Sequence, residues 1–167
     1  MQLLFRPRDL RYLGEGTLPF GTFDDTKKWL PITRYLEMGA ERFPDKIMFR
    51  VADKDGRLAE SYTYKTNEWA NQIANGLRQK FGVNKGDKVG MYMLNCSQYV
   101  VSIIGIHKAG GVQVPINKDE KGERLAYVIN YSDMEVLIID LDSLPFIQEI
   151  GKDLKNLKTI FVTGNPN

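Results

Sequence analysis

The chain has 167 residues, of which 43% are hydrophobic and 26% are charged, and its formal net charge is +2. This length corresponds to about one domain, and the hydrophobic fraction is sufficient for a sizeable core. The 23 basic and 21 acidic residues are scattered in both signs, so no charged block indicates a nucleic-acid partner. We therefore expect none.

Cysteine usage and hydropathy indicate the compartment. Cys96 is the only cysteine, so no internal disulfide can form. The opening residues lack the apolar region of a signal peptide. The longest mainly apolar run, residues 99–106, is far shorter than the roughly 20 residues that a membrane-spanning helix requires. We expect a cytoplasmic protein, and leave peripheral contact with a membrane open.

The first half of the chain predicts a leader, a helix and a hairpin. Residues 1–29 show no sustained periodicity and are interpreted as a leader segment. A helix is expected to start near Pro31 and to end before Pro44. Residues 47–52 and 58–64 flank an Asp-Gly turn, which is typical of two antiparallel strands.

Residues 65–82 predict the second helix, with Gly82 as its left-handed stop. The pattern separates an apolar stripe from a polar face. The predicted apolar stripe consists of Trp69, Ala70, Ile73, Ala74, Leu77 and Phe81. The predicted polar face consists of Asn67, Glu68, Asn71, Gln72 and Arg78.

The second half alternates short β-rich runs with helical segments. The runs begin at Lys88, Val112, Val136 and Thr159, at intervals of 24, 24 and 23 residues. The helical segments are 97–109, 123–131 and about 143–154. Because parallel neighbours require a crossover connection, this alternation predicts an α/β fold. We expect a parallel, Rossmann-like sheet with helices on both faces.

The segment between the predicted helix at residues 97–109 and the strand that begins at Val112 predicts an abrupt helix end. Gly110 and Gly111 allow a left-handed stop, and Lys108 lies favourably at the negative end of the helix. Gly105 and Ala109 are four residues apart, so they form a small helix face that we expect to approach the sheet closely.

Several apparent sites do not have the required pattern. Residues 82–88 lack the spacing of a phosphate-binding loop, and residues 53–56 lack the ligands of a calcium loop. Residues 14–16 lack the third glycine of a dinucleotide fingerprint. His107 is the only histidine and Cys96 has no evident partner base, so we predict no metal site and name no catalytic residue.

Six consecutive blocks resemble the amino-terminal portion of adenylate-forming enzymes, and in order and spacing they are most similar to the acyl-CoA synthetases. The blocks are Ala40–Lys46, the Tyr-Thr-Tyr sequence before the second helix, Gly82–Gly90, Leu94–Val100, Gly105–Asn117 and Glu123–Ile138. The proline-isoleucine-asparagine end of the fifth block favours the CoA ligases over the adenylation domains of peptide synthetases, which stay an alternative.

The resemblance implies a two-step reaction. A carboxylate and ATP, with Mg²⁺, give an acyl-adenylate and pyrophosphate, and the thiol of CoA then gives the thioester. The family's phosphate-binding loop, ribose-binding Asp and carboxy-terminal catalytic Lys do not stand in this sequence. The resemblance therefore implies that residues 30–167 are the first α/β subdomain, truncated before the phosphate-binding loop. Such a piece is expected to be inactive alone and to hold no cofactor.

The partners implied are the rest of the same enzyme and a small carboxylate substrate, and a piece with open surfaces could self-associate. In residues 118–125 the chain departs from the family pattern: Lys121 cannot cap a helix and Gly122 weakens its first turn, so the helix start there is uncertain. A binding or scaffold module without catalysis and a flavodoxin-like nucleotide domain are the alternatives from other functional classes.

Ligands of parallel sheets gather beyond the carboxyl ends of the strands. This rule makes Asn95, Ser97 and Asn117 the candidate ligand contacts, since they follow the first two predicted parallel strands. The alternative is structural: Ser97 would cap its helix, and the two asparagines would satisfy turn backbone.

Overall fold

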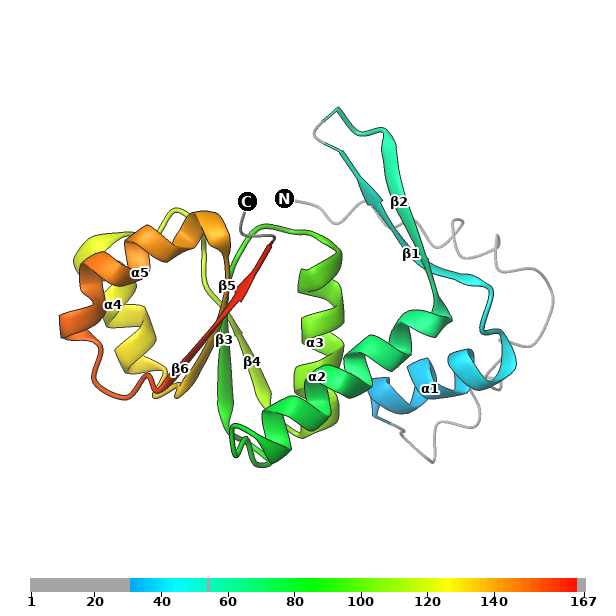
Figure 1. Ribbon diagram of the computed structural model, residues 1–167, viewed down its shortest axis with the longest axis horizontal. Coiled ribbons are helices and arrows are strands. Elements are labelled where there is room, and N and C mark those ends of the chain that lie inside the picture. The colour runs from blue at the N-terminus through cyan, green and yellow to red at the C-terminus, as the bar shows by residue number, and fades with distance from the viewer. Residues whose placement is uncertain (1–30, 54, 165–167) are drawn as a thin grey trace, which may run out of the picture.

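The computed structural model describes residues 31–53 and 55–164, so the predicted leader lies outside the described residues. The described chain contains a 4-stranded sheet in the order β4-β3-β5-β6 and a 2-stranded sheet made of β1 and β2. The larger sheet and its helices form one part of the molecule, and the hairpin projects from the other (Figure 1).

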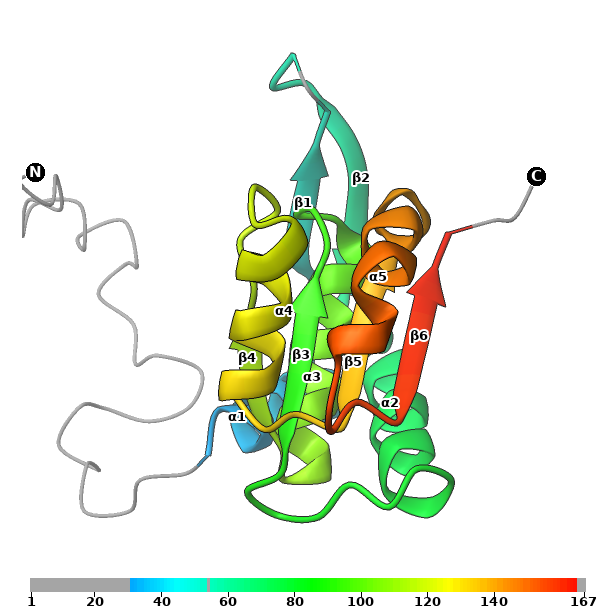
Figure 2. The same cartoon turned by 90° about the vertical axis from the view of Figure 1, so that its left-hand side faces the viewer.

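The larger sheet is parallel throughout, as the sequence predicts. Its strands are β3 (Lys88–Tyr92), β4 (Val112–Pro115), β5 (Val136–Asp140) and β6 (Thr159–Thr163). Each strand begins at the predicted residue. β3 is central and pairs with both β4 and β5, whereas β4 and β6 form the two edges (Figure 2).

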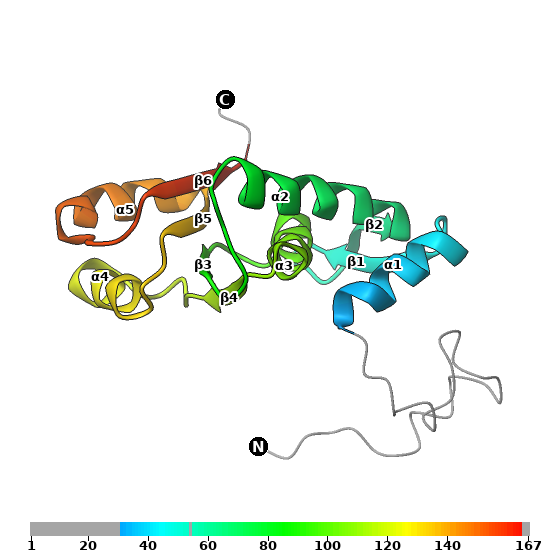
Figure 3. The same cartoon turned by 90° about the horizontal axis from the view of Figure 1, so that it is seen from below.

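Helices cover both faces of this sheet, which confirms the predicted α/β class. The helices α2 (Asn67–Gln79) and α3 (Ser97–Ala109) lie on one face. The helices α4 (Gly122–Tyr131) and α5 (Leu144–Ile150) lie on the other (Figure 3). Successive side chains of β5 point to opposite faces of the sheet, so each helical layer receives every second residue. Val136 and Ile138 pack in the core under α2 and α3. Leu137 and Ile139, which alternate with them, pack under α4 and α5.

The predicted first helix and hairpin are also present. The helix α1 covers Ile32–Arg42, and β1 (Ile47–Ala52) pairs antiparallel with β2 (Leu58–Thr63). The hairpin packs at its base, where the rings of Phe49 and Tyr62 stack with centroids 4.8 Å apart. The Tyr62 ring also meets Trp69 of α2 edge to face, with centroids 6.1 Å apart, and this contact holds the base of the hairpin against the helical layer.

The Asp-Gly turn of the hairpin is organised by an aspartate side chain. The Asp53 carboxylate accepts hydrogen bonds from the backbone N–H groups of Asp55 and Arg57, both at 2.9 Å. An aspartate that bonds backbone a few residues ahead is a common turn-forming device. The turn interpretation of residues 53–56 thus agrees with the structure.

Three details of the predicted α2 faces are wrong. Phe81 was expected in the apolar stripe but lies beyond the end of α2 at Gln79 and is 39% exposed. Trp69 was expected in the apolar stripe but is 52% exposed, and Asn67 was expected on the polar face but is only 8% exposed. Both lie in the first turn of α2, where a 3₁₀ turn over Tyr64–Thr66 changes the direction of the chain. The 3.6-residue period does not extend through that turn.

The last predicted helix is interrupted. Instead of one helix over residues 143–154, a 3₁₀ turn at Leu141–Ser143 leads into α5, and a second 3₁₀ turn follows at Gly151–Asp153. Glycine has low helix propensity, and short 3₁₀ turns are common at helix ends. By contrast, the uncertain helix over residues 123–131 does form and starts one residue earlier, at Gly122, with no side-chain cap from Lys121.

The end of α3 is formed as predicted, but Lys108 has a different role. Gly110 is left-handed, with φ of 87°. Lys108 donates hydrogen bonds to Glu37 Oε1 at 2.9 Å and to Asn71 Oδ1 at 2.8 Å, and its side chain is only 7% exposed. This lysine joins three helices, α1, α2 and α3. Its hydrogen bond lowers the pKa of Glu37 against the opposing effect of burial.

Gly105 gives close helix packing, but against α2 and not the sheet as expected. A Cβ at this position would lie 2.5 Å from Ile73 Cγ2 and 3.2 Å from the carbonyl oxygen of Ala70. Both residues belong to α2. The small residue therefore sets the separation between α2 and α3, while Ala109 lies in the sheet core.

We predict that Gly105→Ala destabilises the fold by about 1–3 kcal/mol, because the added methyl overpacks the contact with α2. Gly76→Ala is the matched control. Gly76 is a helical glycine in α2 whose Cβ would meet nothing within 4 Å, so alanine should stabilise by up to about 1 kcal/mol. Urea unfolding followed by circular dichroism measures both. Equal effects of the two substitutions would contradict the contact.

Candidate functional site

The strand order creates a crevice at the carboxyl edge of the sheet. From β3 the chain passes through α3 on one face to β4, and from β4 it passes through α4 on the other face to β5. The order therefore reverses between the neighbouring strands β3 and β5. In open α/β sheets such a switch point is the usual ligand position, outside the carboxyl ends of the strands.

The structure places the three predicted candidates near this edge with different partners. Asn117 is exposed, and its Oδ1 accepts the N–H of Asp119 at 3.1 Å in the turn after β4. Ser97 is 7% exposed at the start of α3, donates to Gln98 Oε1 at 3.0 Å and does not cap the helix. Asn95 is exposed in the loop after β3, and its side chain makes no hydrogen bond within the described residues.

A charged cluster closes the same edge beneath these residues. Lys118 Nζ donates to both carboxylate oxygens of Asp140, at 2.8 and 3.0 Å, and also to Ser143 Oγ. Ser143 is fully buried and contacts both Asp140 and the carbonyl of Tyr92. The second oxygen of Asp140 accepts the N–H of Leu94 at 3.1 Å. The loops that follow β3, β4 and β5 are thus joined at one carboxylate.

A buried tyrosine at the end of β3 supports the loop after β4. The Tyr92 hydroxyl donates to the carbonyl oxygen of Glu120 at 2.8 Å and accepts a hydrogen bond from Lys121 Nζ at 2.5 Å. The Lys121 ammonium also lies 3.6 Å from the ring centroid of Phe146 in α5, a cation–π contact. The loop over residues 118–121 is therefore fixed by side chains from β3 and α5.

The pKa of Asp140 is lowered although burial alone would raise it. Hydrogen bonds from Lys118, Ser143 and the Leu94 N–H stabilise the ionised form and outweigh the desolvation. With side-chain exposures of 19% for Lys118 and 22% for Asp140, the ion pair is only partly screened by water. The carboxylate is thus a paired structural anion and is poorly suited to act as a base.

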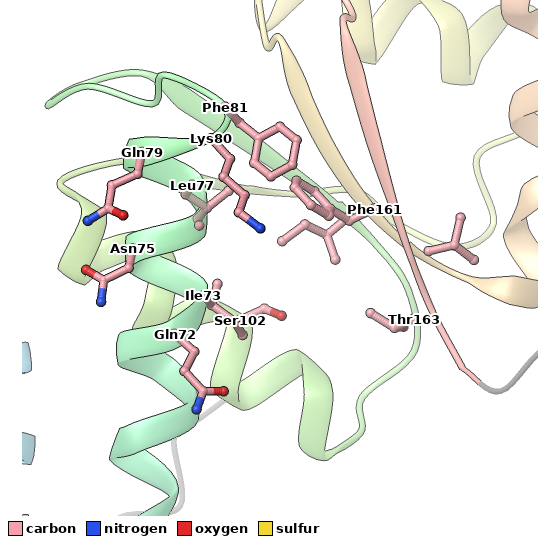
Figure 4. A pocket seen from close by; sticks show the side chains of 13 residues that line it. Gln72, Ile73, Asn75, Leu77, Gln79, Lys80, Phe81, Ser102, Phe161 and Thr163 are labelled. Atoms are coloured by element: carbon pink, nitrogen blue, oxygen red, sulfur yellow. The ribbon is translucent and has the colours of Figure 1, made fainter.

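A larger hollow than this edge offers lies elsewhere in the described chain. It is an open groove of about 710 Å³ between α2 and β6, lined on its apolar side by Ile73, Leu77, Phe81 and Phe161. The two phenylalanine rings meet edge to face with centroids 4.6 Å apart. Figure 4 shows these side chains turned toward one another across the groove. Its apolar side offers surface for packing, and its polar lining contains a single charged residue, Lys80.

Neither a metal cluster nor a membrane span occurs in residues 31–53 and 55–164. These residues contain no group of at least three His, Cys, Asp or Glu side chains that could hold a metal ion. None of the helices in this part is long and apolar enough to cross a membrane. His107 is exposed on α3, and Cys96 is partly buried just before that helix.

The sequence of the chain matches the family model for AMP-binding enzymes over residues 36–166. The chain belongs to the AMP-binding enzyme family. This match covers the predicted parallel-sheet region together with α2, the hairpin and most of α1. It agrees with the resemblance carried by the six sequence blocks.

Individual members of the AMP-binding family give the same result. The chain is 32% identical over 134 residues to a medium/long-chain-fatty-acid–CoA/3-oxocholest-4-en-26-oate–CoA ligase from Mycobacterium marinum, covering 80% of this chain and 23% of that protein. It is 31% identical over 111 residues to a crotonobetaine/carnitine–CoA ligase from Salmonella enteritidis, covering 66% of this chain and 21% of that protein. The chain thus spans between a fifth and a quarter of the length of these curated relatives.

A solved structure supports the fold assignment. A fatty acyl CoA synthetase from Mycobacterium tuberculosis superposes with a TM-score of 0.69 at 25% identity. The superposition covers 79% of this chain and 26% of that chain. The described fold therefore corresponds to about one quarter of that AMP-binding enzyme.

The sequence locates this edge of the AMP-binding fold but not the cluster that closes it. Asp140 ends a strand at the same edge as the predicted candidates, so the carboxyl-edge rule could have found it. Lys118 directly follows Asn117, and its positive charge could have been paired with the carboxylate of Asp140. Ser143 gives no signal, because the sequence pattern places it at the start of a helix.

Asp140→Asn should reduce the pH dependence of stability on the acid side. The folded pKa of Asp140 is lower than its unfolded value of about 3.9, so the ionised group stabilises the fold above that pH. This contribution is lost as pH falls through the folded pKa. We expect the variant to be less stable at pH 7 and its stability to change less between about pH 5 and pH 2. Chemical unfolding at a series of pH values measures this.

The exposed neighbour Asp142 supplies the control for that measurement. Asp142 lies two residues after Asp140, in the 3₁₀ turn that directly follows it, and its side chain accepts no hydrogen bond within the described residues. Asp142→Asn should keep the acid-side slope of the unmodified chain. If both variants changed the slope equally, the ion pair with Lys118 would not be its source.

Proposed function

We propose that this chain is the amino-terminal part of an acyl-CoA ligase of the AMP-binding family, with residues 30–167 as its first α/β subdomain. The complete enzyme would convert a carboxylate and ATP, with Mg²⁺, to an acyl-adenylate, and then transfer the acyl group to CoA. The family match over residues 36–166 carries this proposal. The names of the relatives, which are CoA ligases for fatty acids and carnitine, favour a CoA ligase over a peptide-synthetase domain.

We propose that the described residues do not themselves bind a nucleoside triphosphate. The ammonium groups of Lys118 and Lys121 are already paired within the chain, with Asp140 and with the Tyr92 hydroxyl. The loop over residues 93–96 contains no glycine that would bring backbone N–H groups around a phosphate. We propose that this part supplies the scaffold and one wall of the substrate cleft, and that phosphate-binding and catalytic groups come from the rest of the enzyme.

Asn95 is the residue of this wall that we propose to contact ligand. Its backbone neighbour Leu94 is held by Asp140, so the loop has a fixed position while the amide of Asn95 stays exposed. A carboxamide can donate and accept hydrogen bonds, as binding of a polar substrate or cofactor group requires. Asn117 and Ser97 already have protein partners and are weaker candidates.

We propose a cytoplasmic location for the enzyme, and peripheral contact with a membrane stays open.

The test of activity is carboxylate-dependent exchange between ATP and pyrophosphate, with a panel of fatty, aromatic and small acids. Residues 1–167 should give no exchange above background. A polypeptide extended to the length of the relatives should give exchange and, with CoA, a thioester. Exchange by residues 1–167 alone would overturn the assignment of the catalytic groups to other parts. Failure of every acid in the longer polypeptide would overturn the ligase proposal.

In that longer polypeptide, Asn95→Ala should lower kcat/KM by about tenfold, for example through a higher KM for one substrate. This is the effect expected from the loss of about one hydrogen bond. Thermal unfolding should not change, since Asn95 is exposed. Asn117→Ala is the comparison, because its side chain bonds backbone and its loss should lower stability more than activity. Equal activity of the Asn95 variant and the unmodified enzyme would remove Asn95 from the site.

A further inference from the structure

A lysine side chain already occupies the position where ligands usually lie in such a sheet. That position is the switch point between the carboxyl ends of β3 and β5. Lys118 belongs to the loop after β4, which lies on the other side of β3, yet its ammonium bonds the Asp140 carboxylate at the end of β5. The same ammonium lies 4.8 Å from the ring centroid of Tyr92, the last residue of β3. Lys118 therefore crosses the end of β3 and fills the switch point with a cation of the chain itself.

The Asp140 carboxylate connects this cation to the loop after β3. Its Oδ2 accepts hydrogen bonds from Lys118 Nζ at 3.0 Å and from the N–H of Leu94 at 3.1 Å, so the cation and the loop share one oxygen. Its Oδ1 accepts Lys118 Nζ at 2.8 Å and the hydroxyl of Ser143. The ammonium thus bridges both oxygens and fixes the rotation at which the carboxylate faces Leu94.

We propose that Lys118 is a positioning residue of the substrate cleft, because through Asp140 it holds the loop that carries Asn95. The side chain of Asn95 makes no hydrogen bond within the described residues, so its place depends on the backbone of this loop. Since Lys118 fills the switch point, a ligand lies beyond it, at the level of Asn95. The inference rests on the proposed ligase function and adds the residue that keeps one wall of its cleft in place.

The charge of Lys118 is what keeps the carboxylate in this position. Without it, Asp140 would be an unpaired anion whose side chain is only 22% exposed, and a partly buried charge without a partner is unfavourable. The carboxylate would then turn toward water and release the N–H of Leu94. Lys121, the other lysine of this loop, cannot replace Lys118, because its ammonium bonds the Tyr92 hydroxyl and the carbonyl oxygen of Lys118.

Amide hydrogen exchange of residues 1–167, resolved by NMR, tests whether Lys118 holds the loop. Lys118→Met removes the charge and keeps a side chain of similar length, so the Leu94 amide should exchange about tenfold faster. Lys118→Arg should keep the protection, because a guanidinium can bond both carboxylate oxygens and lie on an aromatic ring. Unchanged protection of the central β5 amides shows that both variants are folded.

Lys158→Met is the matched control for this measurement. It removes a lysine that pairs with Glu135 at 2.7 Å, at the opposite, amino edge of the sheet. The Leu94 amide should exchange in this variant as it does in the unmodified chain. Faster exchange after both substitutions would assign the effect to general destabilisation and would overturn the proposal.

Activity of the longer polypeptide tests whether Lys118 acts through Asn95. Lys118→Met should lower kcat/KM by about tenfold for the same substrate that Asn95→Ala affects. In the Asn95→Ala background it should have little further effect, because the group that it positions is already absent. A merely structural role would lower kcat/KM by the same factor in both backgrounds, and Lys118→Arg would then not restore it.

Two further results would overturn the proposal. One is exchange of the Leu94 amide that Lys118→Met leaves unchanged. The other is a double variant in which the losses of kcat/KM from Lys118→Met and Asn95→Ala multiply. Failure of every acid in the longer polypeptide would overturn the ligase proposal instead, while faster exchange of the Leu94 amide would still show that Lys118 holds the loop.

Discussion

The structure depends on the central position of β3, which pairs in parallel with β4 on one side and β5 on the other. Parallel neighbours cannot be joined by a tight turn, so the chain must cross over once on each face. These crossovers supply α3 and α4 and bury both faces of the strand. Gly90 in β3 shows how close the packing is: a Cβ there would collide with Met134 and Leu137. Burial on both faces and the crevice at the carboxyl edge therefore have one cause.

That crevice is closed by charge and not by apolar packing. Asp140 holds Lys118 and the N–H of Leu94, so one carboxylate fixes the loops after β3, β4 and β5. Partly buried ion pairs often add little net stability, because desolvation offsets their attraction. Their clearer effect here is positional: the exposed loop carrying Asn95 is attached to a rigid group. A site on one wall of an enzyme requires such fixed loops before any ligand binds.

The sequence predicted the strand starts and the fold class because both depend on local signals, namely β-rich runs at regular spacing and glycine at Gly110. It failed where a contact from distant residues decides the outcome. Trp69 is exposed because the turn before α2 redirects the first helical residues, and Lys108 is buried because Glu37, in α1, neutralises it. The cluster at the carboxyl edge joins residues from three separate loops. Their charges are visible in the sequence, but their pairing requires the sheet order.

The same physics makes some parts of the described chain much more densely packed than others. Between its two helical layers the sheet is buried, whereas the tip of the hairpin exposes Leu58 at 60%. A two-stranded hairpin is only marginally stable alone, and this one is supported mainly at its base by Phe49, Tyr62 and the helices. The hairpin tip is therefore the part of the described chain with the least packing to stabilise it.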